Sequence, residues 1–326
     1  MDDPVASAHD ERGVPQMKAW QFIGVGSPLT LRDVDVPEAG PGQVLIDVKA
    51  SGLCHSDIGY LEGTITHLPF APITLGHEMS GVIAQVGAGV TGFKIGQRVA
   101  IPSTLETPGN ASDGGFAEYV VARQEHILGI PDDVDFVHAA LAMDAGMTSY
   151  HAVRYGGTKQ GTRIGIIGLG GLGFLGAQFA LALGAEVYGV EINEDVWPRA
   201  LDVGVADVAR SIGEFADKNL EVIIDFAGFG TTTAEAFEAI GHGGTVVQVG
   251  LGRSTATIST WALLSKELRY LGSAGGTFDD VRAVLDLFSR NKVKPLLSTV
   301  SFEQIGEAIG RLERGRVDGR IVAVQH

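Results

Sequence analysis

The chain of 326 residues is long enough for two domains with sizeable cores, and its 45% hydrophobic and 19% charged residues are ordinary for a soluble globular protein. A formal net charge of −15 without a basic cluster argues against nucleic acid or an anionic membrane as a partner. The single cysteine, Cys54, excludes an internal disulfide and fits a cytoplasmic protein, and no apolar run reaches the roughly 18 residues of a membrane-spanning helix. Residues 1–16 are polar and acidic, lack the order of a signal peptide, and are expected to form a flexible tail.

The first part of the chain has the pattern of a β domain. Short segments in which apolar and polar residues alternate are separated by turns rich in glycine and proline, such as the turn at residues 39–42. The expected strands are residues 18–22, 29–36, 44–50, 81–86, 98–101 and 116–121. They predict a compact, mostly antiparallel β domain, and residues 136–154 then have a helical pattern.

Three residues of this first part are possible metal ligands. Cys54 stands in the stretch GLCHSD, His77 in GHE and Asp144 in AMDAG. Thiolate, imidazole and carboxylate all bind zinc, and three protein ligands with one open position are typical of a catalytic site. The spacing alone does not decide the matter, because a lone cysteine is commonly a small buried residue and a lone histidine a hydrogen-bonded structural one.

From about residue 163 to residue 272, strand and helix patterns alternate. We expect strands at 164–167, 187–190, 222–225, 245–249 and 268–271, and helices at 172–183, 196–203, 233–239 and 260–265. This alternation predicts an α/β fold with a doubly wound parallel sheet. Two further helices, at 279–289 and 302–314, and a strand at 321–324 are expected to fold back onto the first domain.

A glycine-rich loop follows the first strand of the alternating region. It contains Gly168, Gly170, Gly171, Leu172 and Gly173. In a strand–loop–helix unit, such glycines permit a tight turn, close approach of a pyrophosphate and close packing of helix on strand, and the helix N-terminus faces the phosphates. Glu191 ends the next strand, where an acid holds the adenosine ribose, so the region predicts a dinucleotide site.

Taken together, these motifs make the chain resemble the zinc-dependent medium-chain alcohol dehydrogenases from about Met17 to its end. Besides the CHSD stretch and the glycine loop, the resemblance rests on GHEMSG at 76–81, GAGV at 87–90, GQRV at 96–99, DGGFAEY at 113–119 and the closing Gly319-Arg320. It implies a GroES-like catalytic domain at 17–152 and 288–326 and an NAD-binding Rossmann domain at 153–287.

The resemblance implies a metal site in the GroES-like domain. Cys54 and His77 would bind the catalytic zinc, and Asp144 falls at the third ligand, where some bacterial secondary-alcohol dehydrogenases carry aspartate. Two roles are open for Glu78, an exchangeable ligand or the acid of an ion pair beneath the site. Asp57 would accept the other ring N–H of His77 and so set its tautomer.

The resemblance also implies residues around the reacting groups. Ser56 matches the hydroxyl that receives the substrate proton, while Thr148 and the strand end near Val249 match positions that hold the nicotinamide. His55 and Arg320 match positions near the pyrophosphate.

Two departures from the family pattern have consequences. Residues 101–113 hold no cysteine where some members carry a four-cysteine lobe for a structural zinc, so at most one zinc is expected per chain. Gly59 stands where many members have a histidine that passes the proton to water, so the proton path is expected to end at Ser56, the cofactor ribose or water.

These expectations lead to one main reading and two alternatives. The main reading is a cytoplasmic enzyme, a homodimer or homotetramer, that interconverts a small-molecule alcohol and an aldehyde or ketone with zinc and NAD. Dimers are expected to form through the edge strand at 268–272. The alternatives are a zinc-free reductase of the same superfamily that reduces an enone or quinone with NADPH, and a non-catalytic dinucleotide-binding protein. The retained Cys54, His77 and Asp57 argue against the reductase, and the intact set of ligands argues against the non-catalytic protein.

Overall fold

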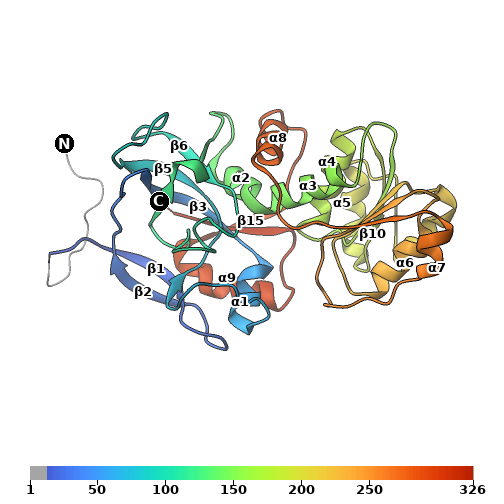
Figure 1. Ribbon diagram of the computed structural model, residues 1–326, viewed down its shortest axis with the longest axis horizontal. Helices are drawn as coiled ribbons and strands as arrows, with labels where there is room; N and C mark the ends of the chain where they lie inside the picture. The colour runs from blue at the N-terminus through green and yellow to red at the C-terminus, as the bar shows by residue number, and fades with distance from the viewer. Residues whose placement is uncertain (1–12, 326) are drawn as a thin grey trace. The chain divides into compact units, whose positions relative to one another are not determined.

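The computed structural model describes residues 13–325, and contacts divide the chain into two compact units (Figure 1). The first unit comprises Met1–Asp144 and Leu297–His326, and the second comprises Ala145–Leu296. Most of the expected tail, residues 1–12, lies outside the described part. No helix within residues 13–325 is long and apolar enough to cross a membrane.

The first unit is built mainly of antiparallel sheet, as the alternating segments predicted. Its strands are β1 (Gln16–Phe22), β2 (Thr30–Asp35), β3 (Gln43–Leu53), β4 (Ile73–Thr74), β5 (Glu78–Val86), β6 (Arg98–Ile101), β7 (Tyr119–Arg123), β8 (Leu128–Gly129), β15 (Leu297–Ser301) and β16 (Arg320–Val324). One sheet has the order β2-β1-β4, and the other has the order β15-β16-β3-β5-β6-β8 with β7 also pairing with β3. The late strand β16 pairs antiparallel with β3, so the end of the chain does return to the first unit.

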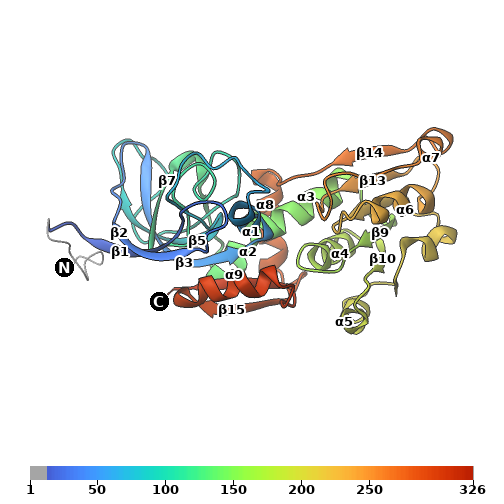
Figure 2. The same cartoon turned by 90° about the horizontal axis from the view of Figure 1, so that it is seen from below.

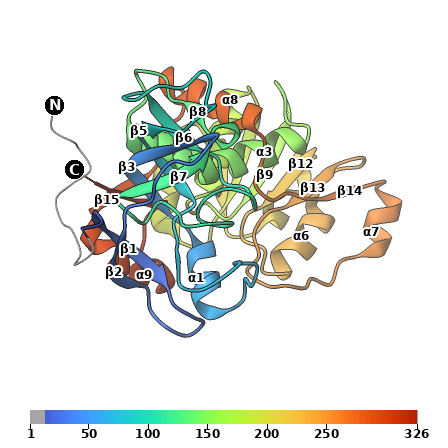
Figure 3. The same cartoon turned by 60° about the vertical axis from the view of Figure 1, so that its left-hand side comes forward.

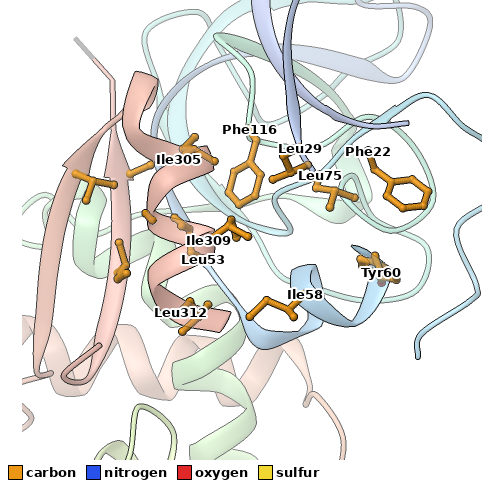
Figure 4. Close-up of a cluster of buried hydrophobic side chains, with 14 of the residues drawn as sticks. Phe22, Leu29, Leu53, Ile58, Tyr60, Leu75, Phe116, Ile305, Ile309 and Leu312 are labelled. Atoms are coloured by element: carbon orange, nitrogen blue, oxygen red, sulfur yellow. The ribbon is translucent and has the colours of Figure 1, made fainter. Parts of the chain in front are cut away.

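Within the described residues of this unit, the α-helices are α1 (His55–Glu62), α2 (Phe136–Leu141) and α9 (Ile305–Glu313). Helix α9 is amphipathic and turns Ile305, Ile309 and Leu312 towards Ile58 of α1 and Leu53 of β3 (Figure 4). All of these side chains are buried, and each contributes roughly 1.5–3 kcal/mol relative to an exposed position. This core fixes α1, and α1 carries the residues that follow Cys54.

The pattern at residues 136–154 predicted one helix, and the structure divides it into α2, a π-helical turn at Ala142–Gly146, and α3 (Met147–Tyr155). Single π-helical turns inside helices occur frequently at functional sites because they redirect one side chain. Here the turn contains Asp144.

The second unit is a parallel six-stranded sheet with the order β11-β10-β9-β12-β13-β14. Its further elements are β9 (Arg163–Ile167), α4 (Gly173–Ala182), β10 (Glu186–Val190), α5 (Trp197–Asp202), β11 (Asp207–Ala209), β12 (Val222–Asp225), α6 (Thr231–Ala239), β13 (Thr245–Gln248), α7 (Thr260–Ser265), β14 (Arg269–Gly272) and α8 (Phe278–Ser289). Figure 1 shows α4 and α5 on one side of this sheet and α6 and α7 on the other. The expected doubly wound sheet is therefore confirmed, with β11 as a short strand that the pattern missed.

The expectation that the helix near 279–289 folds back onto the first domain is wrong. Helix α8 belongs to the second unit, where it buries Val281, Val284 and Phe288. The Phe288 ring lies 6.4 Å from that of Phe179 in α4. These apolar contacts explain why α8 packs within the second unit and not onto the first.

A buried carboxylate, Asp280, joins α8 to α3. It accepts hydrogen bonds from Arg154 Nε at 2.8 Å, from His151 Nδ1 at 2.8 Å and from the Thr277 hydroxyl at 2.7 Å. Replacing Asp280 by asparagine is expected to lower the free energy of unfolding by about 2 kcal/mol at pH 7, because the amide cannot accept all of these bonds. The thermal midpoint measures this loss. Asp286→Asn is the control on the same helix, since its exposed pair with Arg290 contributes about 0.5 kcal/mol or less.

The Asp280 contribution also depends on pH. Burial by itself raises the pKa of Asp280, but hydrogen bonds from Arg154, Thr277 and His151 outweigh it and lower that pKa to about 2. A folded-state pKa below the ordinary 3.8 means that the stabilisation is complete above about pH 4 and is lost as the pH falls towards 2. The stability difference between the unmodified protein and Asp280→Asn should therefore shrink between pH 4 and pH 3, and a constant difference would contradict this account.

Candidate active site

The first unit brings four possible metal ligands together. One ligand atom from each of Cys54, His77, Glu78 and Asp144 lies within 4.8 Å of the others, and the described residues contain no second group of this kind. Cys54 is the N-cap of α1, His77 directly precedes β5, Glu78 is the first residue of β5, and Asp144 lies in the π-helical turn. Residues far apart in the sequence are thus gathered at one place by the sheet and by α2.

The donor atoms have the spacing that a zinc ion needs. Cys54 Sγ lies 3.6 Å from Asp144 Oδ2, and His77 Nε2 lies 3.7 Å from the same oxygen. Two atoms bound tetrahedrally at roughly 2.0–2.3 Å from one ion are roughly 3.3–3.8 Å apart. The combination of thiolate, imidazole and carboxylate also suits zinc better than calcium or magnesium, which prefer oxygen ligands.

Behind the ligands, His77 faces a second acid. Its Nδ1 lies 3.5 Å from Asp57 Oδ1, and within residues 13–325 neither of these two buried atoms has a hydrogen-bond partner. The other oxygen of Asp57 accepts a bond from the Cys54 N–H at 2.9 Å. Asp57 therefore connects to two candidate ligands, and the long contact to His77 leaves room for a small adjustment when the imidazole binds an ion.

Buried charge at this place is high. Burial raises the pKa of Glu78 to about 7 even though the guanidinium of Arg320 contacts its carboxylate. Burial also raises the pKa of Asp144, but the hydrogen bond and charge of His77 outweigh it and lower that pKa to about 2. Several acidic groups that are largely buried together require cations, and a divalent ion beside Arg320 would meet this requirement.

Gly52 is a site residue that the sequence reasoning missed. It pairs with Glu78 across β3 and β5, and a Cβ at position 52 would lie 2.3 Å from Glu78 Oε2. Only glycine leaves the Glu78 side chain its place beneath the ligands. The sequence hinted at this role only through the position of Gly52, two residues before Cys54. The need for glycine there becomes evident only when the pairing of β3 with β5 is known.

The remaining predicted residues of the first unit are placed as follows. Ser56 Oγ lies 3.6 Å from Cys54 Sγ, so the hydroxyl is next to the candidate ligands. His55 is the exposed first residue of α1. Arg320 is buried at the start of β16 and contacts Glu78, a partner that was not anticipated.

The glycine loop lies in the second unit, between β9 and α4. Gly168 has a φ of 84°, and a Cβ at position 173 would lie 1.7 Å from the Gly168 carbonyl oxygen, so both positions require glycine. A Cβ at Gly170 would meet nothing within 4 Å, which leaves open space at the position expected to face a pyrophosphate. Gly171 and Leu172 complete the loop, and the Leu172 carbonyl accepts a bond from the Ser149 hydroxyl at 2.9 Å.

Glu191 directly follows β10 and is bonded to this loop. Its carboxylate accepts hydrogen bonds from the Leu169 N–H at 3.0 Å and the Asn193 N–H at 2.9 Å. Thr148 is buried in the first turn of α3, and Val249 directly follows β13 with its N–H bonded to the Asp225 carbonyl at 3.0 Å. The predicted cofactor residues of this unit thus lie in the glycine loop and at the ends of β10 and β13, and Thr148 lies in helix α3.

Comparison with known proteins agrees with both units. A family model for the alcohol dehydrogenase GroES-like domain matches residues 40–132, and one for zinc-binding dehydrogenases matches residues 171–290. An alcohol dehydrogenase of Geobacillus stearothermophilus is 32% identical over 94% of this chain and 98% of its own length, and an NAD-dependent alcohol dehydrogenase of Sulfolobus acidocaldarius is 30% identical over 94% and 99%. The structure of acetophenone reductase from Geotrichum candidum in complex with NAD superposes with a TM-score of 0.87 at 32% identity, covering 95% of this chain and 97% of that one. The chain therefore belongs to the zinc-type alcohol dehydrogenases of the medium-chain dehydrogenase/reductase superfamily.

Proposed function

We propose that this protein oxidises an alcohol reversibly to an aldehyde or ketone, with one zinc ion per chain and NAD as hydride acceptor. The observation that carries the proposal is the convergence of Cys54, His77 and Asp144 at distances that suit one ion. The NAD dependence named for one relative and the complex with NAD of another support the cofactor.

Cys54, His77 and Asp144 would hold the ion, with Glu78 as a fourth acid at the same place. A bound zinc ion supplies Lewis acidity, which lowers the pKa of an alcohol hydroxyl. Ser56 lies beside Cys54, where its hydroxyl would take up the substrate proton while it passes its own proton to the cofactor ribose or to water. Asp57 would orient His77 through its ring nitrogen. Arg320 balances the charge of Glu78 beneath the ligands.

The second unit provides the cofactor site of this proposal. The N-terminus of α4 and the backbone of the glycine loop are available to the pyrophosphate, and Glu191 to the adenosine ribose. NAD supplies the redox chemistry, while Thr148 and Val249 would hold the nicotinamide.

A screen of primary and secondary alcohols with NAD and with NADP, together with metal analysis of the same sample, tests this function. We expect alcohol-dependent formation of NADH and about one zinc per chain. A metal-free protein that reduces enones or quinones with NADPH would favour the zinc-free reductase. Absence of turnover despite dinucleotide binding would favour the non-catalytic alternative.

We further propose that the protein forms a homodimer through β14. Within the described sheet β14 pairs only with β13, so one of its edges is open (Figure 2). The N–H groups of Arg269 and Ser273 point to β13, so that of Gly272 points to the open edge. Leu268, which we expected at this edge, is instead buried in the core of the second unit.

The variant Gly272→Pro tests this assembly, because proline removes an outward N–H while leaving the bonds to β13 intact. We expect sedimentation at micromolar concentration to give a dimer for the unmodified protein and a monomer for Gly272→Pro. Gly272→Ala should remain dimeric, since a Cβ there meets nothing within 4 Å. A monomeric unmodified protein would rule out the β14 dimer.

A further inference from the structure

Gln248 is the last residue of strand β13, and its amide contacts three other parts of the second unit. Its Nε2 donates a hydrogen bond to the Gly250 carbonyl at 2.6 Å, and its Oε1 accepts one from the Tyr270 hydroxyl at 3.2 Å. The Thr233 hydroxyl of α6 lies 3.0 Å from the same Oε1. Figure 3 shows β12, β13 and β14 side by side. Of these three, β13 is the middle strand.

The bond to Gly250 fixes a carbonyl in a crowded place. A Cβ at Gly228 would lie 2.0 Å from the Gly250 oxygen, and a Cβ at Gly250 would lie 2.3 Å from the Phe226 oxygen. Among residues 13–325 the Gly250 carbonyl has no hydrogen-bond donor besides Gln248. The orientation of this peptide group therefore depends on one side chain.

The peptide belongs to the segment 249–253, which is bonded to the segment after β12. The Gly252 N–H donates to the Ala227 carbonyl at 3.2 Å, and the Arg253 N–H donates to the Gly228 carbonyl at 2.8 Å. Ala227 in turn lies against the glycine loop, since a Cβ at Gly168 would be 3.2 Å from its Cβ. The strand order reverses between β9 and β12, and dinucleotides bind at the carboxyl ends of the strands at such a point.

We propose that Gln248 is a positioning residue for the dinucleotide, because its amide holds segment 249–253 in the conformation that binds the nicotinamide end. The proposal rests on the proposed function, which assigns Val249 to the nicotinamide. Without the amide donor, the Gly250 carbonyl loses its hydrogen bond and the peptide group between residues 250 and 251 becomes mobile, although backbone bonds still hold the rest of the segment. Binding must then order the segment again, which weakens the affinity for the cofactor.

The test uses two variants of the full chain. Gln248→Leu removes the donor at similar size, and Gln248→Glu keeps the acceptor but places an oxygen opposite the Gly250 carbonyl. Both should raise the dissociation constant for NADH about tenfold in a fluorescence titration, while the KM for the alcohol changes less than twofold. In the cofactor-free protein, hydrogen exchange of segment 249–253 should become faster.

Gln178→Leu is the matched control. Gln178 is another hydrogen-bonded glutamine of the second unit. It is buried, and its Nε2 is bonded to the Lys294 carbonyl at 3.1 Å, but it belongs to α4. It should lower the thermal midpoint and leave NADH affinity unchanged. Folded Gln248 variants with unchanged NADH affinity, or an equal loss of affinity in Gln178→Leu, would overturn the positioning role. An unmodified protein that binds no dinucleotide would overturn the proposed function itself.

Discussion

Cys54→Ala and His77→Ala are each expected to abolish zinc binding and alcohol oxidation together. Each change removes one of three ligand atoms that lie close together in a buried site. Loss of the ion removes several kcal/mol of stabilisation of developing negative charge, which corresponds to a fall in kcat/KM of about a thousandfold or more. Metal content and steady-state kinetics on the same preparations measure the two effects.

Asp144 allows a sharper comparison within the same experiment. Asp144→Ala should lose the ion, whereas Asp144→Cys should retain it, because a thiolate carries the same charge and also binds zinc. Loss of zinc in both variants would show that the carboxylate is needed for folding of the π-helical turn rather than as a ligand. A metal-free Cys54→Ala protein with full activity would exclude the zinc mechanism.

The architecture of both units was predictable because their patterns are local. The alternation of strand and helix from β9 to β14 follows from apolar runs bounded by glycine, and the loop at Gly168 and Gly173 has backbone requirements that only glycine meets. The three-residue strand β11 was missed because so short a segment carries no periodicity. The position of α8 was wrong because an amphipathic helix shows which face is buried and not which partner buries it.

For the candidate metal site, the sequence predicted which residues take part but not how they are arranged in space. Residue types and a family resemblance selected Cys54, His77 and Asp144, but their distances depend on long-range strand pairing and on the π-helical turn. Gly52 was missed for the same reason, since its requirement arises from Glu78 on the neighbouring strand. Contacts between distant segments follow from register, and a single sequence does not contain register explicitly.

Glu191 is expected to make NAD the preferred cofactor by at least tenfold in kcat/KM over NADP, which requires about 1.4 kcal/mol of discrimination. Its carboxylate is held by the N–H groups of Leu169 and Asn193, so it has little freedom to move away from a 2′-phosphate. The ribose hydroxyls of NAD can donate hydrogen bonds to this acid, whereas a phosphate at the same place is repelled. Glu194, three residues further along the chain, adds another negative charge. It forms an ion pair with Arg210 at 2.8 Å, so the Arg210 guanidinium is already paired and is less available to attract the phosphate.

The variant Glu191→Ser removes the repelling charge and opens space for the phosphate, so the preference should relax through a gain with NADP and a loss with NAD. Glu191→Gln separates charge from size, because the amide keeps an acceptor for the ribose without a negative charge. The ratio of kcat/KM with NAD to kcat/KM with NADP should be lower in Glu191→Gln than in the unmodified enzyme and higher than in Glu191→Ser. Equal turnover of NAD and NADP by the unmodified enzyme would show that Glu191 does not meet the ribose. In that case the role of Glu191 would be structural: its carboxylate would stabilise the glycine loop by accepting hydrogen bonds from the N–H groups of Leu169 and Asn193.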